Sequence, residues 1–171
     1  MDVYDSWTKD VFETPVVGKS QNILSEATLR PLGREIAQEQ GIPHYLLAHP
    51  ALSNGDGSID LFADLNKGEK ITQMSGTATA LAERAERVAR QARPSAGRDI
   101  AGALMVYCGG CMLSIRDKME VVFNGTNAAL DDAPFLTHFS FGEQGQVFGG
   151  SNRHGNLMIS CLVFSAPEPT T

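Results

Sequence analysis

The stretch Ile100-Ala-Gly-Ala-Leu-Met-Val-Tyr107 decides the fold, because it is a continuous apolar run without polar alternation. Such a pattern is typical of a strand at the centre of a sheet, buried on both faces. The run stops at Cys108-Gly-Gly-Cys111, where two glycines allow a tight turn. We therefore expect residues 100–107 to form the central strand.

Two further strands are predicted near the C-terminus. Residues 135–141 alternate apolar and polar side chains, and residues 157–164 form a second strand-like run. The segment 114–129 has the pattern of a helix, with Ser114 at the N-cap position. A crossover through this helix would place 135–141 parallel to 100–107, with 157–164 antiparallel to both.

The N-terminal half has weaker signals. Residues 29–40 have helical composition, and residues 45–49 resemble a short strand. The turn sequence Asn54-Gly-Asp-Gly57 precedes residues 58–64, which we expect to form a hairpin with residues 70–74.

Residues 77–93 predict an amphipathic helix. Its apolar stripe contains Leu81, Ala85, Val88 and Ala92. Glutamates 83 and 86 stand four residues before arginines 87 and 90, a spacing typical of self-paired charges on a solvated face. The positive charge of the chain is concentrated here, in Arg84, Arg87, Arg90, Arg93 and Arg98.

These elements predict an α+β fold: one mixed, largely antiparallel sheet of about six strands, with helices 77–93 and 114–129 packed mainly on one face. The length of 171 residues predicts a single domain over residues 1–171. Within it we expect an N-terminal connecting segment, 1–43, and a loose tail, 166–171.

The charge and composition of the chain argue against several classes of partner and location. The net charge of −6 argues against nucleic acid or an anionic membrane as a partner, because phosphate groups bind basic surfaces. The N-terminus lacks the basic and apolar regions of a signal peptide, and no apolar run is long enough to span a bilayer. Three cysteines are too few for a disulfide scaffold. These features predict a cytoplasmic protein.

Three glycine-framed polar clusters lie at the ends of the predicted strands, where sheet proteins place binding sites. We expect them to form one concave ligand site. Its candidate residues are Cys108, Gly109, Gly110 and Cys111, then Gly142, Glu143, Gln144 and Gly145, then Asn152, Arg153 and His154.

Other chemistry stays open at these positions. A thiol before a helix is a candidate for redox or hydrolytic catalysis, centred on Cys108. Cys108 and Cys111 are also candidate zinc ligands, together with His154, Cys161 or His138 from other strands. We assign no catalysis to Glu143, because no nucleophile with catalytic spacing stands near it.

The C-terminal half also resembles a known family. Gly102-Ala-Leu104, Cys108-Gly-Gly110, Pro134-Phe-Leu136 and Gly142-Glu143 together resemble the C-terminal half of FIST domains, which are intracellular sensory modules of signal-transduction proteins. The segment 154–160 resembles the bacterial branch, which is associated with histidine kinases. Many members have arginine where this chain has Cys111.

The resemblance implies small-ligand sensing without turnover, with haem and nitric oxide as the ligand class proposed for some members. His154 is then the candidate haem ligand, because an imidazole nitrogen binds iron. It also implies an N-terminal companion domain, which we expect to be absent from this chain, or a signalling protein such as a histidine kinase as partner. The alternatives are a thiol-dependent enzyme centred on Cys108 and a structural half that binds no ligand alone.

Overall fold

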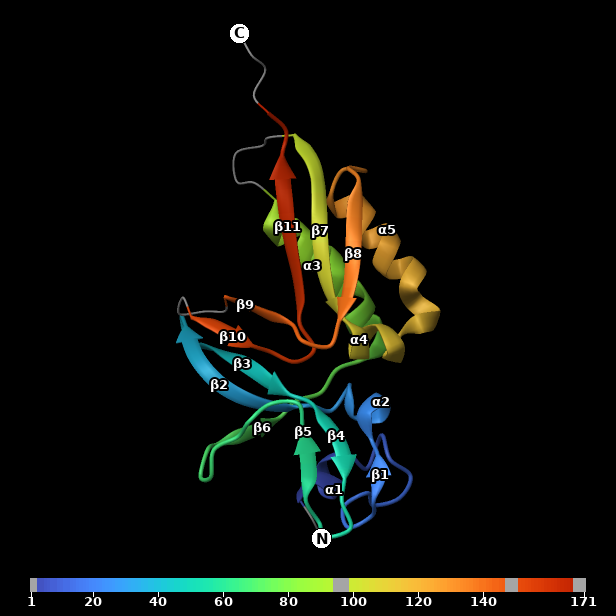
Figure 1. Cartoon of the computed structure of the whole chain (residues 1–171), viewed down its shortest axis with the longest axis vertical. Helices are drawn as coiled ribbons and strands as arrows, with labels where there is room; N and C mark the ends of the chain where they lie inside the picture. Colours follow the sequence, from blue (N-terminus) through green and yellow to red (C-terminus); the bar gives the residue numbers. More distant parts are fainter. Residues whose placement is uncertain (1–2, 94–98, 147–150, 168–171) are drawn as a thin grey trace. The chain divides into compact units, whose positions relative to one another are not determined.

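The structure is a computed structural model and describes residues 3–93, 99–146 and 151–167. The chain forms two compact units (Figure 1). The first unit contains Met1–Thr77 and Gly142–Leu157, and the second contains Ala78–Phe141 and Met158–Thr171. The chain thus leaves the first unit after Thr77 and returns to it for residues 142–157.

The second unit contains the predicted central strand. Strand β7 (Ile100–Cys108) lies between β11 (Ile159–Ser165) and β8 (Phe135–Ser140) (Figure 1). Strand β11 runs antiparallel to β7, and β8 runs parallel to it. The central place predicted for residues 100–107 and the predicted directions of the three strands are confirmed. The helical crossover between β7 and β8 favours their parallel pairing.

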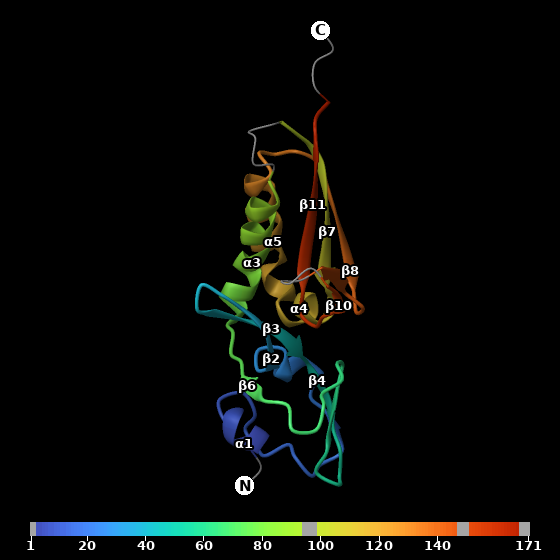
Figure 2. The ribbon, with the colours of Figure 1, turned by 90° about the vertical axis from the view of Figure 1, so that its left-hand side faces the viewer.

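The two long helices that the structure describes in this unit cover the same face of the sheet. Figure 2 shows α3 (Ala78–Ala92) and α5 (Met119–Ala129) on the same side of β7, β8 and β11. Met105 is fully buried and shares the helix-facing side of β7 with Tyr107, whose hydroxyl reaches the Leu81 carbonyl of α3 at 3.4 Å. The expectation of helices on one face is confirmed.

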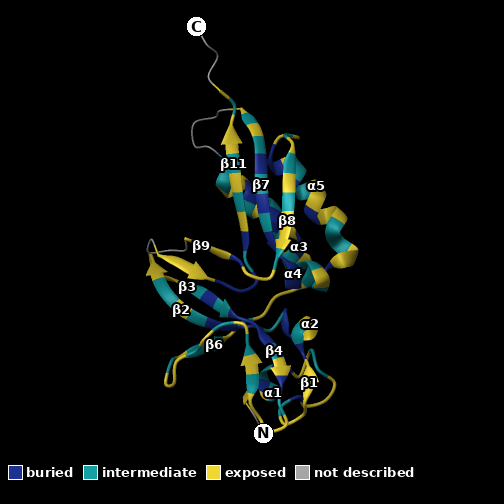
Figure 3. Ribbon diagram, in the orientation of Figure 1, coloured by how far each residue is buried: buried dark blue, intermediate teal, exposed yellow. Residues whose placement is uncertain are grey.

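On the opposite face of the sheet, several apolar side chains are exposed among the described residues. Leu162 of β11 and Leu136 of β8 pair with Leu104 on this side and are 56% and 67% exposed. In Figure 3, exposed residues alternate with less exposed ones along β8 and β11. The prediction that residues 100–107 are buried on both faces is therefore wrong, because both long helices of this unit pack on the same side.

Helix α3 confirms the helix predicted over residues 77–93, but its buried stripe is shifted. The buried residues are Ala82, Ala85 and Ala89, while Leu81 and Val88 are only partly buried. Alanines face the interior because the helices approach closely. A Cβ added at Gly125 of α5 would lie 3.1 Å from the Cβ of Glu86 on α3.

The predicted charge pairs of α3 are present. Arg87 lies 3.7 Å from Glu83, and Arg90 lies 2.7 Å from Glu86. Arg93 instead donates to the Ala129 carbonyl at 3.0 Å and pairs with Asp131, so it joins the end of α3 to the end of α5. Arg98 lies outside the described residues.

The helix predicted over residues 114–129 is divided into shorter pieces. Helix α4 (Gly109–Ser114) follows β7 directly, a 3-10 turn spans Arg116–Lys118, and α5 begins at Met119. Ser114 is not the N-cap of a long helix. Its hydroxyl donates to the Gly110 carbonyl at 3.0 Å and lies at the end of α4.

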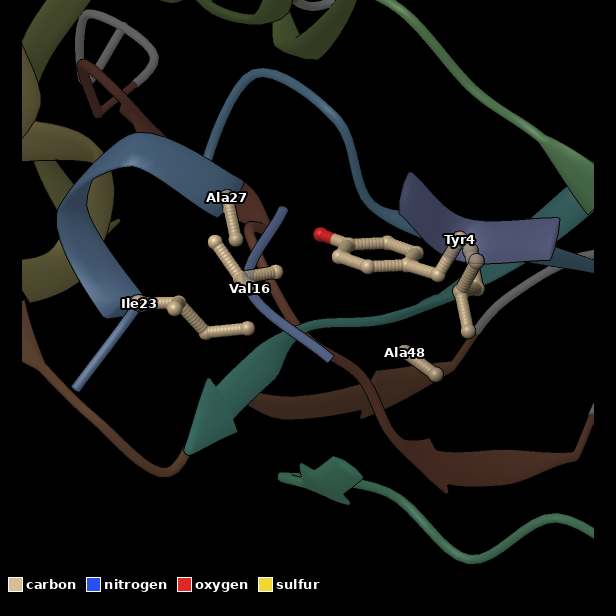
Figure 4. Packing of buried hydrophobic residues seen from close by; sticks show 6 residues of the cluster. Tyr4, Val16, Ile23, Ala27 and Ala48 are labelled. Atoms are coloured by element: carbon tan, nitrogen blue, oxygen red, sulfur yellow. The ribbon is translucent and has the colours of Figure 1, made fainter. Parts of the chain in front are cut away.

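The first unit has its own core, which Figure 4 shows from close by. Tyr4 of α1 (Val3–Trp7) packs with Val16, Ile23 and Ala48, and with Ala27 of α2 (Leu24–Ala27). Burial raises the pKa of Tyr4 to about 12, against the opposing effect of Arg30. Much of this core comes from residues 1–43, the segment expected to serve as a connection.

The helix predicted over residues 29–40 is wrong. Residues Leu32–Glu39 form strand β2, which pairs with β3 (Ile42–Ala48) through a two-residue turn. Both turn residues, Gln40 and Gly41, have positive φ angles of 51° and 81°. This backbone fits the twist of a hairpin, and glycine adopts it readily. The expectation of a strand near 45–49 agrees with β3.

The hairpin predicted between residues 58–64 and 70–74 is also wrong. Strand β5 (Ile59–Leu61) pairs with β4 (Pro50–Ser53), which also pairs with β1 (Gln21–Asn22). Strand β6 (Ile71–Gln73) pairs instead with β2. The predicted turn at residues 54–57 connects β4 to β5. Strand β5 therefore pairs with β4, which precedes it, and not with β6, which follows it.

The α+β class is confirmed, with a different sheet organisation. Over the described residues the strands form four small sheets in place of one sheet of about six strands. The fourth is the hairpin of β9 (Gln144–Gln146) and β10 (Asn152–His154). None of the helices that the structure describes has the length and apolar character needed to cross a bilayer.

Candidate functional site

Two of the three predicted clusters form one hairpin in the first unit. Strands β9 and β10 pair antiparallel, with Gln144 opposite His154, Gly145 opposite Arg153, and Gln146 opposite Asn152. The three side chains of β10 are exposed. The pairing therefore gathers an imidazole, a guanidinium and three amides on one short piece of sheet.

Glu143 lies at the base of this hairpin. Its backbone carbonyl accepts a hydrogen bond from the Gly155 N–H at 3.1 Å, which closes the hairpin below its last strand pair. Glu143 is buried, at 5% exposed, whereas Gln144 and His154 are exposed. A carboxylate is costly to bury, so its place beside an exposed polar hairpin favours a specific role.

Asn156 follows the hairpin and anchors it to the rest of the unit. Its side-chain oxygen accepts a hydrogen bond from the His49 N–H at 2.9 Å, and its amide donates to the Phe62 carbonyl at 3.3 Å. The chain thereby fixes the start of β4 and the end of β5 with one buried side chain. Sequence reasoning did not include Asn156 among the candidate residues.

His49 is a buried member of this network. Its Nε2 lies 2.9 Å from the Leu24 carbonyl and 3.2 Å from the Thr28 hydroxyl. Since a carbonyl only accepts, Nε2 carries the hydrogen. Burial lowers the pKa of His49, and the bond to Leu24 opposes this shift only in part. His49 is therefore a structural residue whose burial favours the neutral ring.

The cysteine cluster lies in the second unit. Cys108 ends β7, and Gly109, Gly110 and Cys111 form the buried first turn of α4. The Cys108 N–H donates to the Met158 carbonyl at 3.1 Å, which ties the turn to the chain entering β11. Gly109 has a packing role, because an added Cβ would lie 2.9 Å from the ring of Phe141.

The structure describes each cluster within its own unit. The hairpin of β9 and β10 belongs to the first unit and the cysteine turn to the second. That all three clusters form one concave site therefore stays a prediction. Among the described residues, no three His, Cys, Asp or Glu side chains are grouped as a metal ion would require.

His154, the candidate haem ligand, was tested against its surroundings. An axial haem ligand needs an apolar enclosure for the macrocycle. In the described part of the hairpin, His154 is exposed and its strand neighbours are polar, with Arg153 beside it and Gln144 opposite. These residues do not fit a haem site, and we derive no haem chemistry from them.

A groove in the first unit was not anticipated from the sequence. It has a volume of about 450 Å³ and lies where β6 leaves β2. Arg34 on one side is 3.4 Å from Glu69 on the other. Its lining is largely charged or polar: Arg34, Glu35, Ile36, Ala37, Gln38, Glu69, Lys70 and Thr72.

Comparison with known proteins places the chain in a family. No curated protein and no solved structure matches it. The FIST C domain model matches residues 1–146, which include the cysteine turn and Glu143. The match ends before segment 154–160, so the resemblance of that segment to the bacterial branch stays a prediction. Because the match covers most of the chain, the protein belongs to the FIST C domain family, a family of sensory domains in signal transduction.

Proposed function

We propose that this chain senses a small polar ligand and transmits its binding to a signalling partner. Family membership supports the sensory role. The pairing of β9 with β10 is the observation that supports the location, because it brings two predicted clusters together. We assign no turnover to these residues.

The chemistry of the hairpin favours a ligand with hydrogen-bonding and charged groups. Arg153 would contact a carboxylate or another anionic oxygen, since a guanidinium presents several donors in a fixed plane. His154 and Asn152 add groups that both donate and accept. The buried carboxylate of Glu143 would balance a positive group on the ligand. A ligand that carries both a negative and a positive group fits these side chains better than a purely apolar ligand.

We extend the site to the turn from Cys108 to Cys111 as part of the same proposal. Gly109 and Gly110 carry no side chains, so a ligand could approach their backbone closely once the ring of Phe141 moves away from Gly109. The partner would be a companion domain or a signalling protein such as a histidine kinase, which would respond to the ligand-bound state.

A thermal-shift panel tests the proposal. The chain is heated with free amino acids, dicarboxylates, nucleotides and haem, each in a separate sample. A ligand that binds only the folded state raises the unfolding midpoint. We expect the rise to be lost in Arg153→Ala and His154→Ala but kept in the control His138→Ala, which changes an exposed histidine on β8. Equal rises in all four proteins would contradict the proposed location.

A further inference from the structure

Cys108 and Cys111 occupy positions from which a disulfide can form. The two residues are three apart across the first turn of α4. From helix geometry their Cα atoms are about 5 Å apart, which lies inside the range of roughly 4.4–6.8 Å that a disulfide requires. Gly109 and Gly110 between them let the backbone adjust without a side-chain clash.

The two sulfur atoms share one environment. Cys108 is 5% exposed and Cys111 is fully buried. Burial raises the pKa of Tyr107 in the first place, and the thiols of Cys111 and Cys108 both raise it further, while Arg84 lowers it. Both thiols therefore lie near the same phenol. All three cysteines of the chain are thiols in this structure.

We propose that Cys108 and Cys111 are a redox modification site, which closes to an intrachain disulfide when the chain meets a low-molecular-weight disulfide such as oxidised glutathione. This is a stoichiometric change of state and not a turnover. It goes beyond ligand sensing and needs no ligand.

The reaction proceeds in two exchanges. The Cys108 thiol loses its proton and attacks one sulfur of oxidised glutathione, and the released glutathione thiolate takes up a proton. The Cys111 thiol then loses its proton and attacks the sulfur of Cys108, releasing the second glutathione. The cysteines lose two electrons and two protons, and oxidised glutathione becomes two reduced molecules. Cys108 reacts first because it is the less buried of the two.

The ring of Phe141 lies against the turn at Gly109 and is 64% exposed. We expect its movement to open the turn to glutathione. Phe141 is also the last residue before the chain returns to the first unit at Gly142. Closing the disulfide would fix the turn beneath Phe141.

Equilibration of the full chain in glutathione buffers, from fully reduced to fully oxidised, tests the site. Samples are quenched with iodoacetamide in concentrated urea, so that buried thiols also react, and analysed by intact mass and peptide mapping. We expect loss of two alkylated thiols in a single transition, an internal disulfide in the peptide that contains residues 108 and 111, and an alkylated Cys161. Cys161→Ser should behave identically, whereas Cys111→Ser should stop at a glutathione adduct on Cys108. Phe141→Ala should oxidise several-fold faster.

Several results would overturn the inference. The first is that all three cysteines of the folded chain are still alkylated after equilibration in oxidised buffer. In this comparison the urea-unfolded chain must form a disulfide in the same buffer. Another is a disulfide that includes Cys161. The wild-type chain decides both points, so the outcome does not depend on the folding of any variant. Because no ligand is present, the result is independent of the thermal-shift panel.

Discussion

The side-chain oxygen of Asn156 accepts a hydrogen bond of 2.9 Å from the backbone N–H of His49, although the two residues are 107 positions apart in the chain. This bond joins the segment that follows β10 to the start of β4. It ties residues 142–157 to the first unit after the chain has passed through residues 78–141 of the second.

Replacing Asn156 should destabilise the first unit. Asn156→Ala leaves the His49 N–H and the Phe62 carbonyl without this partner, and each buried unsatisfied group costs about 1–3 kcal/mol. We expect a loss of about 2–4 kcal/mol in urea unfolding. Asn152→Ala is the control, because Asn152 is exposed and should cost no more than about 0.5 kcal/mol. Equal losses in the two variants would mean that the Asn156 bonds contribute nothing specific.

His49 should make the stability depend on pH. In the folded chain the pKa of His49 lies below its ordinary value of about 6.5, because burial disfavours the charged ring. The unfolded state therefore binds the proton more readily, and stability is lost as the pH falls below about 6.5. We expect the urea midpoint to fall more steeply on mild acidification in the wild type than in His49→Gln. Parallel pH curves for the two proteins would contradict this.

The open face of the β7 sheet gives a matched pair of substitutions. Met105→Ala removes a fully buried side chain and should cost about 2–5 kcal/mol. Leu162→Ala, on the opposite face, removes a side chain that is 56% exposed and should cost less than about 1 kcal/mol. Urea unfolding measures both. An equally large cost for Leu162→Ala would show that something covers this face in solution.

The close approach of α3 and α5 at Gly125 is also testable. A larger side chain meets the Cβ of Glu86, which is fixed to the helix backbone and cannot turn away. Gly125→Leu should therefore cost about 1–3 kcal/mol in thermal or urea unfolding. Ala128→Leu enlarges a small side chain at an exposed position of α5 and serves as the control. A neutral Gly125→Leu would mean that the helices separate without cost.

The second unit was predictable because its signals are long and mutually consistent. Strand β7 is a nine-residue strand with an apolar run, and one helical crossover sets its pairing with β8. The sequence could not show that one face stays open, because apolar Leu104 and Leu162 look the same whether or not they are covered. The buried stripe of α3 consists of alanines because α5 approaches closely at Gly125. The sequence of α3 alone could not show this, because Gly125 belongs to another helix.

The strands of the first unit were harder to predict, because irregular strand pairing interrupts the alternation of apolar and polar residues. Strand β2 contains a bulge at Ile36, where the register with β3 shifts. The extra residue breaks the two-residue alternation, and the remaining spacing of Leu32 and Ile36 resembles a helix. The sequence Gln40-Gly41 was the available signal for a hairpin between β2 and β3. Among the site residues, the clusters of β9 and β10 were found from glycine framing, while Asn156 was missed because its partners are far away in sequence.

The most direct test of the sensory proposal is a map of backbone amide chemical shifts for the whole chain, recorded with and without the compound that the thermal-shift panel identifies. The account predicts the largest changes at residues 143–146 and 152–154, with further changes at 108–111. Changes confined to the groove between β2 and β6, around Arg34 and Glu69, would contradict it.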